Sequence, residues 1–373
     1  MIDQQPSPDA ALAPRPRLLS TGRALPPHFA DQETLLERFR KLWSERHFNL
    51  ERLEQLHRSV RVGGRHLAIP LDDYDKLTTF AQRNDAFISA AVDVGAAALQ
   101  SALDRAGLQA RDLDHLYFVT VTGIATPSID ARLVNRLGLR PDIKRTPIFG
   151  LGCVAGAAGV ARMTDVLRGF PGEVGALVSV ELCSLTLQRE DLSIANIIAS
   201  GLFGDGGAAV VAAGGERAQA LHDAGAPRRG PEILATRSVF YPDTERVMGW
   251  DVVDSGFKVV LSPAVPKLVL ERIRGDVDDF LGAQGLTRSD LRHWVCHSGG
   301  PKVLEAFETA LELPRAALRR TWASLESVGN LSSASVLFVL DELLEEQSAL
   351  PGDLGLLLAM GPGFCSELVL LRW

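Results

Sequence analysis

The sequence predicts an α/β protein built from two similar halves. Apolar strand-like segments alternate with helix-like segments along most of its 373 residues, which is the pattern of layered α/β architectures. Two segments in different halves of the chain each start at a turn glycine and pass into a helix of small residues, at residues 152–167 and 329–344. Their similarity is weak. This similarity is expected if two βαβ-type halves each place a helix N-terminus in one shared cleft.

Hydrophobic patterning predicts the individual elements. Residues 85–108 are rich in alanine with helical spacing, and Ala106-Gly107 provides a C-terminal stop signal. Short, continuous apolar runs predict buried strands. These strands are expected at residues 116–122, 146–149, 176–182, 208–213, 293–296, 354–360 and 367–373.

Composition shifts suggest where the chain divides. Residues 218–231 are rich in Ala, Gly, Pro and Arg and are the best candidate for a connection between halves. We therefore predict a loose tail at residues 1–16, an N-terminal half at 17–225 and a C-terminal half at 226–373. The tail lacks the basic and apolar regions of a signal peptide, and no run approaches the roughly 18 apolar residues that span a bilayer.

Composition and charge exclude several classes of protein. The chain is 46% apolar and 23% charged, as soluble globular proteins are. Its net charge of −7, without a dense basic block, argues against a nucleic-acid partner. The cysteines lie far apart without a CxxC pair, which argues against a zinc site or disulfide framework and favours a reducing cytoplasm. They are Cys153, Cys183, Cys296 and Cys365.

Cys153 is the most informative single residue. It follows a strand-like run and a glycine turn and precedes a helix of small residues, which is the layout of a nucleophile elbow with a thiol in place of serine. A helix N-terminus lowers the pKa of a thiol and raises its thiolate fraction. The alternative is a small buried apolar side chain, as most free cysteines are.

Two further residues could act with this thiol. His297 follows an apolar strand and precedes a glycine-rich turn, where α/β sheets place reactive groups. Asn330 lies in Gly-Asn-Leu-Ser, which is also an ordinary turn and helix cap. A hydrogen-bonded structural histidine is the corresponding alternative for His297. Charged or loop surroundings predict mostly surface positions for the other histidines: His28, His47, His57, His66, His115, His222 and His293.

Together, cysteine, histidine and asparagine suit covalent acyl transfer. An imidazole can take the thiol proton, and an asparagine amide with an imidazole N–H can stabilise an enolate or oxyanion. Papain-like proteases share the order Cys, His, Asn. However, their cysteine lies near the mature N-terminus in a different local motif, and Cys153 has neither context.

At these residues the chain closely resembles the type III polyketide synthases, the chalcone synthase-like branch of the thiolase superfamily. The resemblance implies a five-layered αβαβα thiolase fold and a homodimer, with no metal and no bound cofactor. Coenzyme A thioesters would be the substrates: Cys153 would take the starter acyl group, while His297 and Asn330 would assist decarboxylation of malonyl-CoA. The matching segments are GLGCVAGAAG at 150–159, LFGDGGAAV at 202–210, HSGGPKVLEA at 297–306, GNLSSASVLFVLDE at 329–342 and MGPGFCSE at 360–367.

The same resemblance implies roles for residues around the catalytic set. Phe203 matches an aromatic gatekeeper, and Gly361, Pro362 and Gly363 match a cyclisation loop, here preceded by Met360 instead of the usual aromatic. Plant enzymes carry a second phenylalanine gate where this chain has Val259, so that gate is weaker or built differently. Candidates for holding coenzyme A near the surface are Arg58, Arg61 and Lys302, which could equally be solvated surface cations.

The starter is predicted from Thr122 and Cys183. Both match residues that border a long acyl tunnel in bacterial alkylpyrone and alkylresorcinol synthases, and a thiol suits an apolar guest. We therefore expect a cytoplasmic enzyme that extends medium- or long-chain acyl-CoA with malonyl-CoA, without stable membrane association. The alternatives are malonyl-CoA as its own starter (giving tetrahydroxynaphthalene or phloroglucinol-like products), an aromatic starter, or a non-catalytic partner subunit.

Overall fold

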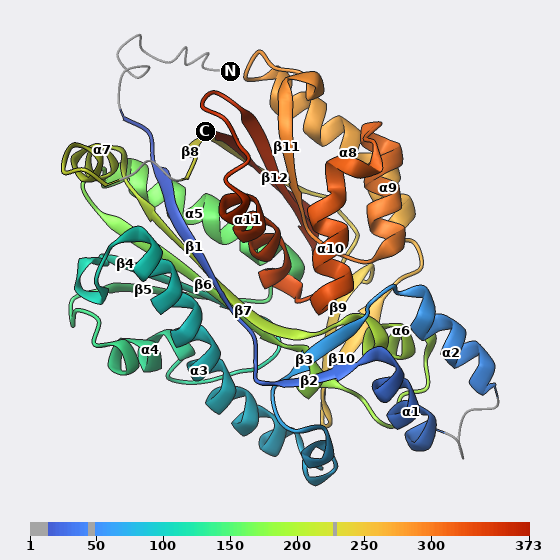
Figure 1. Ribbon diagram of the computed structural model, residues 1–373. Coiled ribbons are helices and arrows are strands. Elements are labelled where there is room, and N and C mark those ends of the chain that lie inside the picture. Colours follow the sequence, from blue (N-terminus) through green and yellow to red (C-terminus); the bar gives the residue numbers. More distant parts are fainter. Residues whose placement is uncertain (1–13, 44–48, 227–229) are drawn as a thin grey trace.

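A nine-stranded mixed sheet organises the molecule (Figure 1). The computed structural model describes residues 14–43, 49–226 and 230–373, so most of the predicted N-terminal tail lies outside the described residues. The strands follow the order β11-β12-β13-β8-β1-β7-β6-β4-β5. Their bounds are β1 Arg17–Ala24, β4 His115–Thr120, β5 Lys144–Phe149, β6 Val174–Leu182, β7 Asp205–Ala213, β8 Glu232–Phe240, β11 Leu291–Cys296, β12 Leu354–Gly361 and β13 Cys365–Arg372.

The sheet has two parts with a similar pairing pattern. In the first part, β4 pairs in parallel with β5 and β6, and β6, β7 and β1 continue as antiparallel neighbours. In the second, β11 pairs in parallel with β12, and β12, β13 and β8 are antiparallel. The two parts join where Arg17 of β1 pairs with Glu232 of β8. All of the strands expected from apolar runs are present, with ends shifted by only a few residues.

Helices make up three layers around these two parts. The helices α5 (Ala155–Gly169) and α11 (Ser335–Glu346) lie between them and contact both. Small residues permit this packing: a Cβ on Gly159 would lie 2.6 Å from the Leu177 side chain. The helices α3 (Phe80–Ala106) and α4 (Ile129–Leu137) cover the outer face of one part, and α8 (Val265–Gly282) with α9 (Pro301–Leu311) covers the other. The predicted five-layered α/β order is therefore confirmed.

The long helix α3 is a core helix of the fold. Its length and composition would allow it to cross a membrane, although polar residues interrupt its apolar sequence. In the fold its apolar face packs against β1, β7 and β6. A capping box at Thr79 starts the helix, and Gly107, in the left-handed conformation with φ +68°, ends it.

Several smaller helices and strands surround one end of the sheet. They were not predicted from the sequence. The helices α1 (Gln32–Trp43), α2 (Leu50–Ser59) and α6 (Ile194–Leu202) pack near one another there. Two small sheets, each of two antiparallel strands, accompany these helices: β2 pairs with β3, and β9 pairs with β10. Their bounds, with those of the remaining helices, are β2 His28–Asp31, β3 Gly64–Leu67, η2 Leu71–Lys76, α7 Gly215–Asp223, β9 Met248–Val253, β10 Gly256–Leu261 and α10 Arg319–Val328. Part of the predicted connection at 218–231 is thus helix α7.

The prediction that the remaining histidines are mostly surface residues was wrong for three of them. His57, His115 and His293 are buried, because each has a polar partner inside the fold. His57 Nε2 lies 3.2 Å from Ser200 Oγ. His115 and His293 are paired with carboxylates. His28 and His66 are partly buried and His222 is exposed, whereas His47 lies outside the described residues.

Candidate active site

Cys153 lies on the predicted strand–turn–helix elbow. It belongs to a single 3₁₀ turn, Gly152–Val154, which follows β5 and leads directly into α5. Gly150 and Gly152 have φ angles of +97° and +54°, a conformation that favours glycine. The turn therefore needs these glycines to deliver the thiol to the start of the helix.

The structure brings Cys153, Asn330 and His297 together through short links. Cys153 Sγ donates a hydrogen bond to Ser332 Oγ at 3.7 Å. The backbone N–H of Ser332 donates to Asn330 Oδ1 at 2.8 Å, and Asn330 Nδ2 donates to the carbonyl of Gly299 at 3.4 Å. Gly299 is two residues beyond His297, and its N–H donates to the His297 carbonyl at 2.9 Å. All three predicted residues are buried, with 2–5% of their surface exposed.

Asn330 is held rigidly at the junction of several elements. It pairs through its backbone with Phe203 in an isolated bridge, where the Gly204 N–H donates to the Asn330 carbonyl at 3.0 Å. Its side-chain oxygen also accepts a hydrogen bond from Ser335 Oγ at 3.3 Å. With the oxygen engaged twice and one N–H donating to the Gly299 carbonyl, the second N–H of Asn330 Nδ2 is the donor that can serve a ligand.

His297 carries an unpartnered ring nitrogen inside the protein. It follows β11, and its backbone N–H donates to the Leu358 carbonyl at 2.9 Å. Its Nδ1 is buried and has no hydrogen-bond partner among the described residues. Burial lowers the pKa of His297 to about 4, so the ring is neutral near pH 7. A buried polar atom without a partner is costly, and a substrate carbonyl or enolate would supply that partner.

The electrostatics of Cys153 differ from the sequence-based expectation. Burial raises the pKa of the Cys153 thiol to about 12, with a smaller contribution from nearby Glu181, while the hydrogen bond with Ser332 lowers it. The expected lowering by the helix N-terminus is thus outweighed by desolvation, which disfavours the charged form. In the protein without substrate, the Cys153 thiol and the His297 imidazole are both neutral. The thiol proton must therefore transfer to His297 when a substrate binds.

A buried carboxylate near the thiol has a role that was not predicted from the sequence. Glu181, near the end of β6, accepts hydrogen bonds from the Val121 N–H at 3.0 Å, from Thr122 Oγ1 at 2.9 Å and from Ser333 Oγ. Burial raises its pKa. An acidic residue inside the apolar strand at 176–182 was the available signal, because strands buried on both faces rarely carry one without partners.

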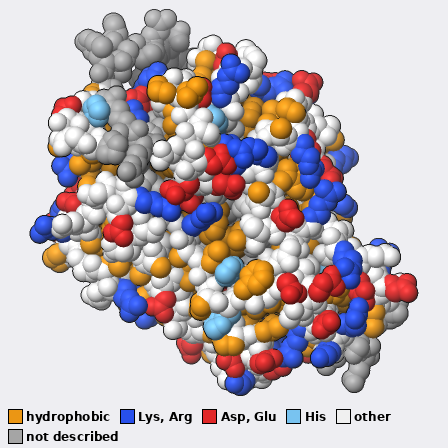
Figure 2. All heavy atoms as spheres, viewed as in Figure 1, with side chains coloured by type: hydrophobic (Ala, Val, Ile, Leu, Met, Phe, Trp, Pro, Cys, Tyr) orange, Lys and Arg blue, Asp and Glu red, His pale blue; other side chains and the backbone are white. Residues whose placement is uncertain are grey.

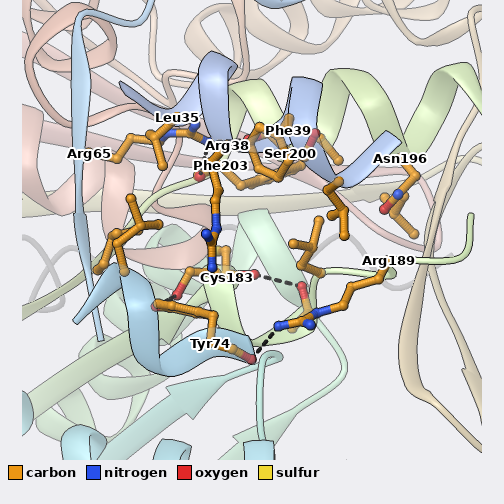
Figure 3. A pocket seen from close by; sticks show the side chains of 18 of the residues that line it. Leu35, Arg38, Phe39, Arg65, Tyr74, Cys183, Arg189, Asn196, Ser200 and Phe203 are labelled. Atoms are coloured by element: carbon orange, nitrogen blue, oxygen red, sulfur yellow. Dashed lines mark hydrogen bonds between the residues drawn. The ribbon is translucent and has the colours of Figure 1, made fainter. Parts of the chain in front are cut away.

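A cavity of about 90 Å³ lies nearby: Cys183 and Phe203 line it, whereas Cys153, His297 and Asn330 do not. Three predicted residues line it: Phe203, Cys183 and Val259. The predicted tunnel residue Thr122 is not in its lining, because its hydroxyl donates to Glu181 and accepts from the Leu182 N–H at 2.9 Å. In Figure 3, the α1 side chains Leu35, Arg38 and Phe39 lie on the opposite side of the cavity from Tyr74.

The wall of the cavity near Tyr74 is a buried polar network that the sequence reading also missed. Tyr74 OH and Ser184 Oγ lie 2.6 Å apart, and Asp205 accepts hydrogen bonds from the backbone N–H groups of Ser184 and Ala68. Burial raises the pKa of Asp205 to about 6. Arg65, whose pKa burial lowers to about 10, donates to the Phe203 carbonyl at 3.0 Å. This network therefore fixes the backbone of Phe203.

The glycine-proline-glycine segment lies against the elbow. Gly361, Pro362 and Gly363 form the turn between β12 and β13. A Cβ on Gly361 would come within 2.6 Å of the Val154 amide nitrogen, and one on Gly152 within 2.7 Å of Pro362. The turn thus packs onto the residues that flank Cys153.

The three predicted coenzyme A contacts lie on the surface. Arg58, Arg61 and Lys302 are all exposed. Arg58 forms an ion pair with Glu33, and Arg61 lies 3.8 Å from Glu305 and over the Trp322 ring. Positive and negative side chains are interspersed on the face in Figure 2 rather than gathered by sign. Among the described residues, no cluster of three or more His, Cys, Asp or Glu side chains could hold a metal ion.

A buried cysteine, histidine and asparagine at the centre of a five-layered α/β fold define an acyltransferase of the thiolase fold. Family comparisons agree with this class. The model of the N-terminal domain of chalcone and stilbene synthases matches residues 9–216, and that of their C-terminal domain matches residues 232–373. The chain belongs to the chalcone and stilbene synthase family and is a type III polyketide synthase.

Relatives and solved structures place it among bacterial members. It is 51% identical to 1,3,6,8-tetrahydroxynaphthalene synthase from Streptomyces peucetius subsp. caesius, over 94% of this chain and 91% of the relative. It is 34% identical to a putative chalcone synthase of Bacillus subtilis (strain 168), over 95% and 98%. The crystal structure of 1,3,6,8-tetrahydroxynaphthalene synthase from Streptomyces coelicolor A3(2), a bacterial type III polyketide synthase, superposes with a TM-score of 0.89 at 32% identity, over 96% of this chain and 99% of that one.

Proposed function

We propose that this protein uses malonyl-CoA both as starter and as extender and forms a product of the tetrahydroxynaphthalene type. The 51% identity over 94% of the chain to a tetrahydroxynaphthalene synthase carries this proposal. It replaces the medium- or long-chain starter expected from Thr122 and Cys183, which the named relatives do not support. Malonyl-CoA as its own starter is one of the alternatives that the sequence left open.

The site supports a covalent decarboxylative condensation. Cys153 Sγ attacks the thioester carbonyl of a coenzyme A ester, His297 takes the thiol proton, and the departing coenzyme A thiolate recovers it. A malonyl-CoA then loses carbon dioxide, and its enolate oxygen accepts hydrogen bonds from the His297 ring N–H and Asn330 Nδ2. The enolate carbon attacks the Cys153 thioester, forming the new carbon–carbon bond and releasing the thiolate for the next transfer.

The size of the side cavity supports a small starter. Its volume is about 90 Å³, whereas an engineered apolar cavity that binds benzene measures about 150 Å³. A lauroyl chain is far larger than benzene. The volume therefore supports a malonyl-derived starter over a long alkyl chain.

A second candidate is the originally expected extension of medium- or long-chain acyl-CoA to an alkylpyrone or alkylresorcinol. One observation favours it: the cavity beside Cys183 is walled largely by apolar side chains, which suit an alkyl tail. Binding of a long alkyl starter would require α1 or the β9–β10 hairpin to move outward. A phloroglucinol-type product, from the same malonyl-CoA starter, is the other outcome, since a phloroglucinol synthase of Pseudomonas fluorescens is 30% identical over 93% of this chain.

Incubation of the purified protein with malonyl-CoA alone tests the proposal. We expect carbon dioxide release and an aromatic product built only from malonyl units, identified by mass spectrometry. Cys153→Ala should abolish the product, whereas Leu350→Ala, at a side chain 66% exposed on the surface, should retain it. A product that forms only when lauroyl-CoA is added would replace the proposal by the second candidate. Absence of decarboxylation would indicate a non-catalytic partner subunit.

Coenzyme A is proposed to enter past Arg58, Arg61 and Lys302. Arg61 lies beside Glu305 of α9, the helix that begins four residues after His297 and carries Lys302. A coenzyme A phosphate bound there would lie at the protein surface beside α9, the helix that follows His297 in the chain. No metal or resident cofactor enters this scheme, and we propose a cytoplasmic location.

We further propose a homodimer that forms at the free edge of the sheet. Among the described residues the edge strand β5 pairs only with β4; Phe149, at the carboxyl end of β5, and Ile124, four residues after β4, are 52% and 44% exposed. Large exposed apolar side chains that gather in one place often mark an interface. We also propose that the halves meet near residue 225, between the two family models, which end at 216 and begin at 232.

A further inference from the structure

We propose that Arg65 is a positioning residue for the condensation and holds Asn330 in register with the end of α6. Arg65 lies in β3 and is only 4% exposed. The hydrogen bonds of its guanidinium go to backbone carbonyls and to a neighbouring glutamine, so it acts through the chain that carries Asn330. The inference rests on the proposed function, because it concerns the decarboxylation step that Asn330 assists.

Two buried side chains cap the C-terminus of α6. The last carbonyls of a helix have no partner within the helix. Arg65 Nη1 donates to the carbonyls of Ser200 and Phe203, the latter at 3.0 Å. Gln32 Nε2 donates to the Gly201 carbonyl at 3.3 Å. A guanidinium also suits the negative end of the helix dipole, so Arg65 fixes the position at which α6 ends.

The carbonyl of Leu202, at the same helix end, is the partner of Asn330. The Asn330 N–H donates to it at 2.9 Å, and the Gly204 N–H donates to the Asn330 carbonyl at 3.0 Å. Both backbone groups of Asn330 are therefore paired with the segment that Arg65 caps. A shift of this segment would move Asn330 with it.

The aliphatic stem of Arg65 packs over the glycines beside this pairing. A Cβ on Gly204 would lie 3.3 Å from Arg65 Cγ, and one on Gly329 would lie 3.4 Å from the same atom. Gly329 directly precedes Asn330 and has a φ angle of +76°, which favours glycine. One side chain thus contacts both of the chain segments that pair at Asn330.

Asp205 is the counter-charge of Arg65. It follows Gly204 in the chain and is fully buried. Burial lowers the pKa of Arg65 to about 10, and attraction to Asp205 opposes that lowering, so the guanidinium is charged near pH 7. Removing one partner of a buried charge pair is strongly destabilising. A variant that tests positioning must therefore keep a cation at position 65.

The consequence for catalysis concerns an oxygen that is present only during the reaction. Asn330 Nδ2 must donate to the enolate oxygen that forms as malonyl-CoA loses carbon dioxide. A displacement of about 1 Å in a reacting site can lower the rate on the order of 10²-fold. Because this contact is made in the transition state, its loss lowers kcat and leaves KM unchanged.

Arg65→Lys tests the inference, with malonyl-CoA as the substrate and carbon dioxide release as the readout. Lysine keeps the charge near Asp205, but its ammonium lacks the planar fork that bonds the α6 carbonyls and Gln32 together. Arg288→Lys is the matched control, because Arg288 also donates to a helix-end carbonyl, that of Leu311 in α9. Thermal unfolding shows whether each variant is folded.

We expect Arg65→Lys to lower kcat for carbon dioxide release by about tenfold or more, with an unchanged KM for malonyl-CoA. Arg288→Lys should match the wild type. Asn330→Ala should lower kcat by roughly 10²-fold, and adding Arg65→Lys to it should cause little further loss, because positioning acts only through the missing amide.

Two results would overturn the inference. One is a wild-type kcat in folded Arg65→Lys. The other is an equal loss from Arg65→Lys with and without Asn330→Ala, which would show a general structural effect. If Arg65→Lys does not fold, Gln32→Ala decides, since it removes no charge and loosens the same cap. Its kcat should fall by a smaller factor, with the same dependence on Asn330, and a wild-type kcat would count against the inference.

Failure of the proposed function gives a different pattern. If the wild type releases carbon dioxide only when lauroyl-CoA is added, the proposed starter is wrong, but the same variants measured with lauroyl-CoA still test Arg65. If the wild type uses malonyl-CoA alone and Arg65→Lys keeps its kcat, the proposed function stands and only the role of Arg65 is refuted. A wild type that never decarboxylates malonyl-CoA refutes both.

Discussion

At the scale of single residues, Ser332 is the contact that most affects the nucleophile. Its hydroxyl is the hydrogen-bond partner of the Cys153 thiol, and its backbone N–H holds the Asn330 side chain. The thiol is otherwise surrounded by groups that disfavour its ionisation, namely buried apolar surface and Glu181. The Ser332 hydroxyl thus lowers the pKa of Cys153, which burial and Glu181 raise. Ser332 also connects two of the three catalytic candidates, Cys153 and Asn330.

Replacing this serine should make the thiol less acidic. In Ser332→Ala, the thiolate loses its hydrogen-bond donor while desolvation remains, so the pKa of Cys153 should rise further. The measurement is the rate of iodoacetamide alkylation of Cys153 against pH, read by mass spectrometry. We expect slower alkylation between pH 8 and 9 and a profile displaced to higher pH.

Ser327→Ala is the control, because this exposed hydroxyl on α10 bonds only to the Ser324 carbonyl. Its alkylation profile should match that of the wild type. A profile for Ser332→Ala that is unchanged, or displaced to lower pH, would show that Ser332 does not stabilise the thiolate.

At the scale of elements, the packing of α3 on β1 depends on a glycine. Gly22 lies in β1, and a Cβ there would overlap the Ala98 carbonyl oxygen and the Ala102 amide nitrogen of α3. Both of those atoms are backbone, so they cannot rotate away as a side chain would. The buried side chains of this helix are largely Ala, Val and Leu, which lets its backbone approach the sheet closely.

Gly22→Ala and Gly275→Ala should therefore change stability in opposite directions. Overpacking at Gly22 should lower the free energy of unfolding by about 1–3 kcal/mol. Gly275 is exposed within α8, and nothing lies within 4 Å of its would-be Cβ. Alanine there should raise the free energy of unfolding by about 0.5–1 kcal/mol, because glycine is a poor helix former.

Urea unfolding followed by circular dichroism measures both changes. If Gly22→Ala were as stable as the wild type, α3 would have to shift from β1 at little cost, contrary to the close packing. If Gly275→Ala were destabilised, α8 would not be the regular exposed helix that the structure shows.

At the scale of the whole molecule, the free edge at β5 and its exposed phenylalanine bear on assembly. Phe149 ends β5 four residues before Cys153, so a partner subunit that packs on Phe149 would also press on the elbow. Charged residues and Pro147 precede it in the strand, and such residues discourage edge-to-edge backbone pairing. The proposed contact is therefore one between side chains.

Phe149→Asp should weaken the proposed dimer. Burying an unpaired carboxylate in an apolar contact costs more than about 1.4 kcal/mol, so the dimer dissociation constant should rise at least about tenfold. Sedimentation velocity over a range of protein concentrations measures it. Leu350→Asp, at an apolar side chain 66% exposed beside the start of β12, should leave the dimer intact. A monomeric wild type, or equal effects of the two variants, would contradict the proposed interface.

Much of the fold was predictable because its signals are local. Continuous apolar runs predicted each of the seven expected strands, and a glycine turn before small residues predicted the elbow at Cys153. The short strands β2, β3, β9 and β10 were not predicted, since four to six residues with mixed exposure carry too little periodicity to stand out. The three buried histidines were missed because their partners are distant in sequence.

The sequence by itself determined the layered α/β class, the catalytic candidates Cys153, His297 and Asn330, and the family, because strand patterns and motifs are properties of neighbouring residues. Only the tertiary structure decided which side chains surround them. Ser332 lies 179 positions from Cys153, and Ser333 lies 152 from Glu181, so their contacts exist only once α5 and α11 pack together. The starter shows the same limit: Thr122 and Cys183 suggested a long chain, but Thr122 does not line the cavity, and the volume beside Cys183 depends on α1 and on Trp250 across from Val259. Cavity size depends on how whole elements pack, which no single motif encodes.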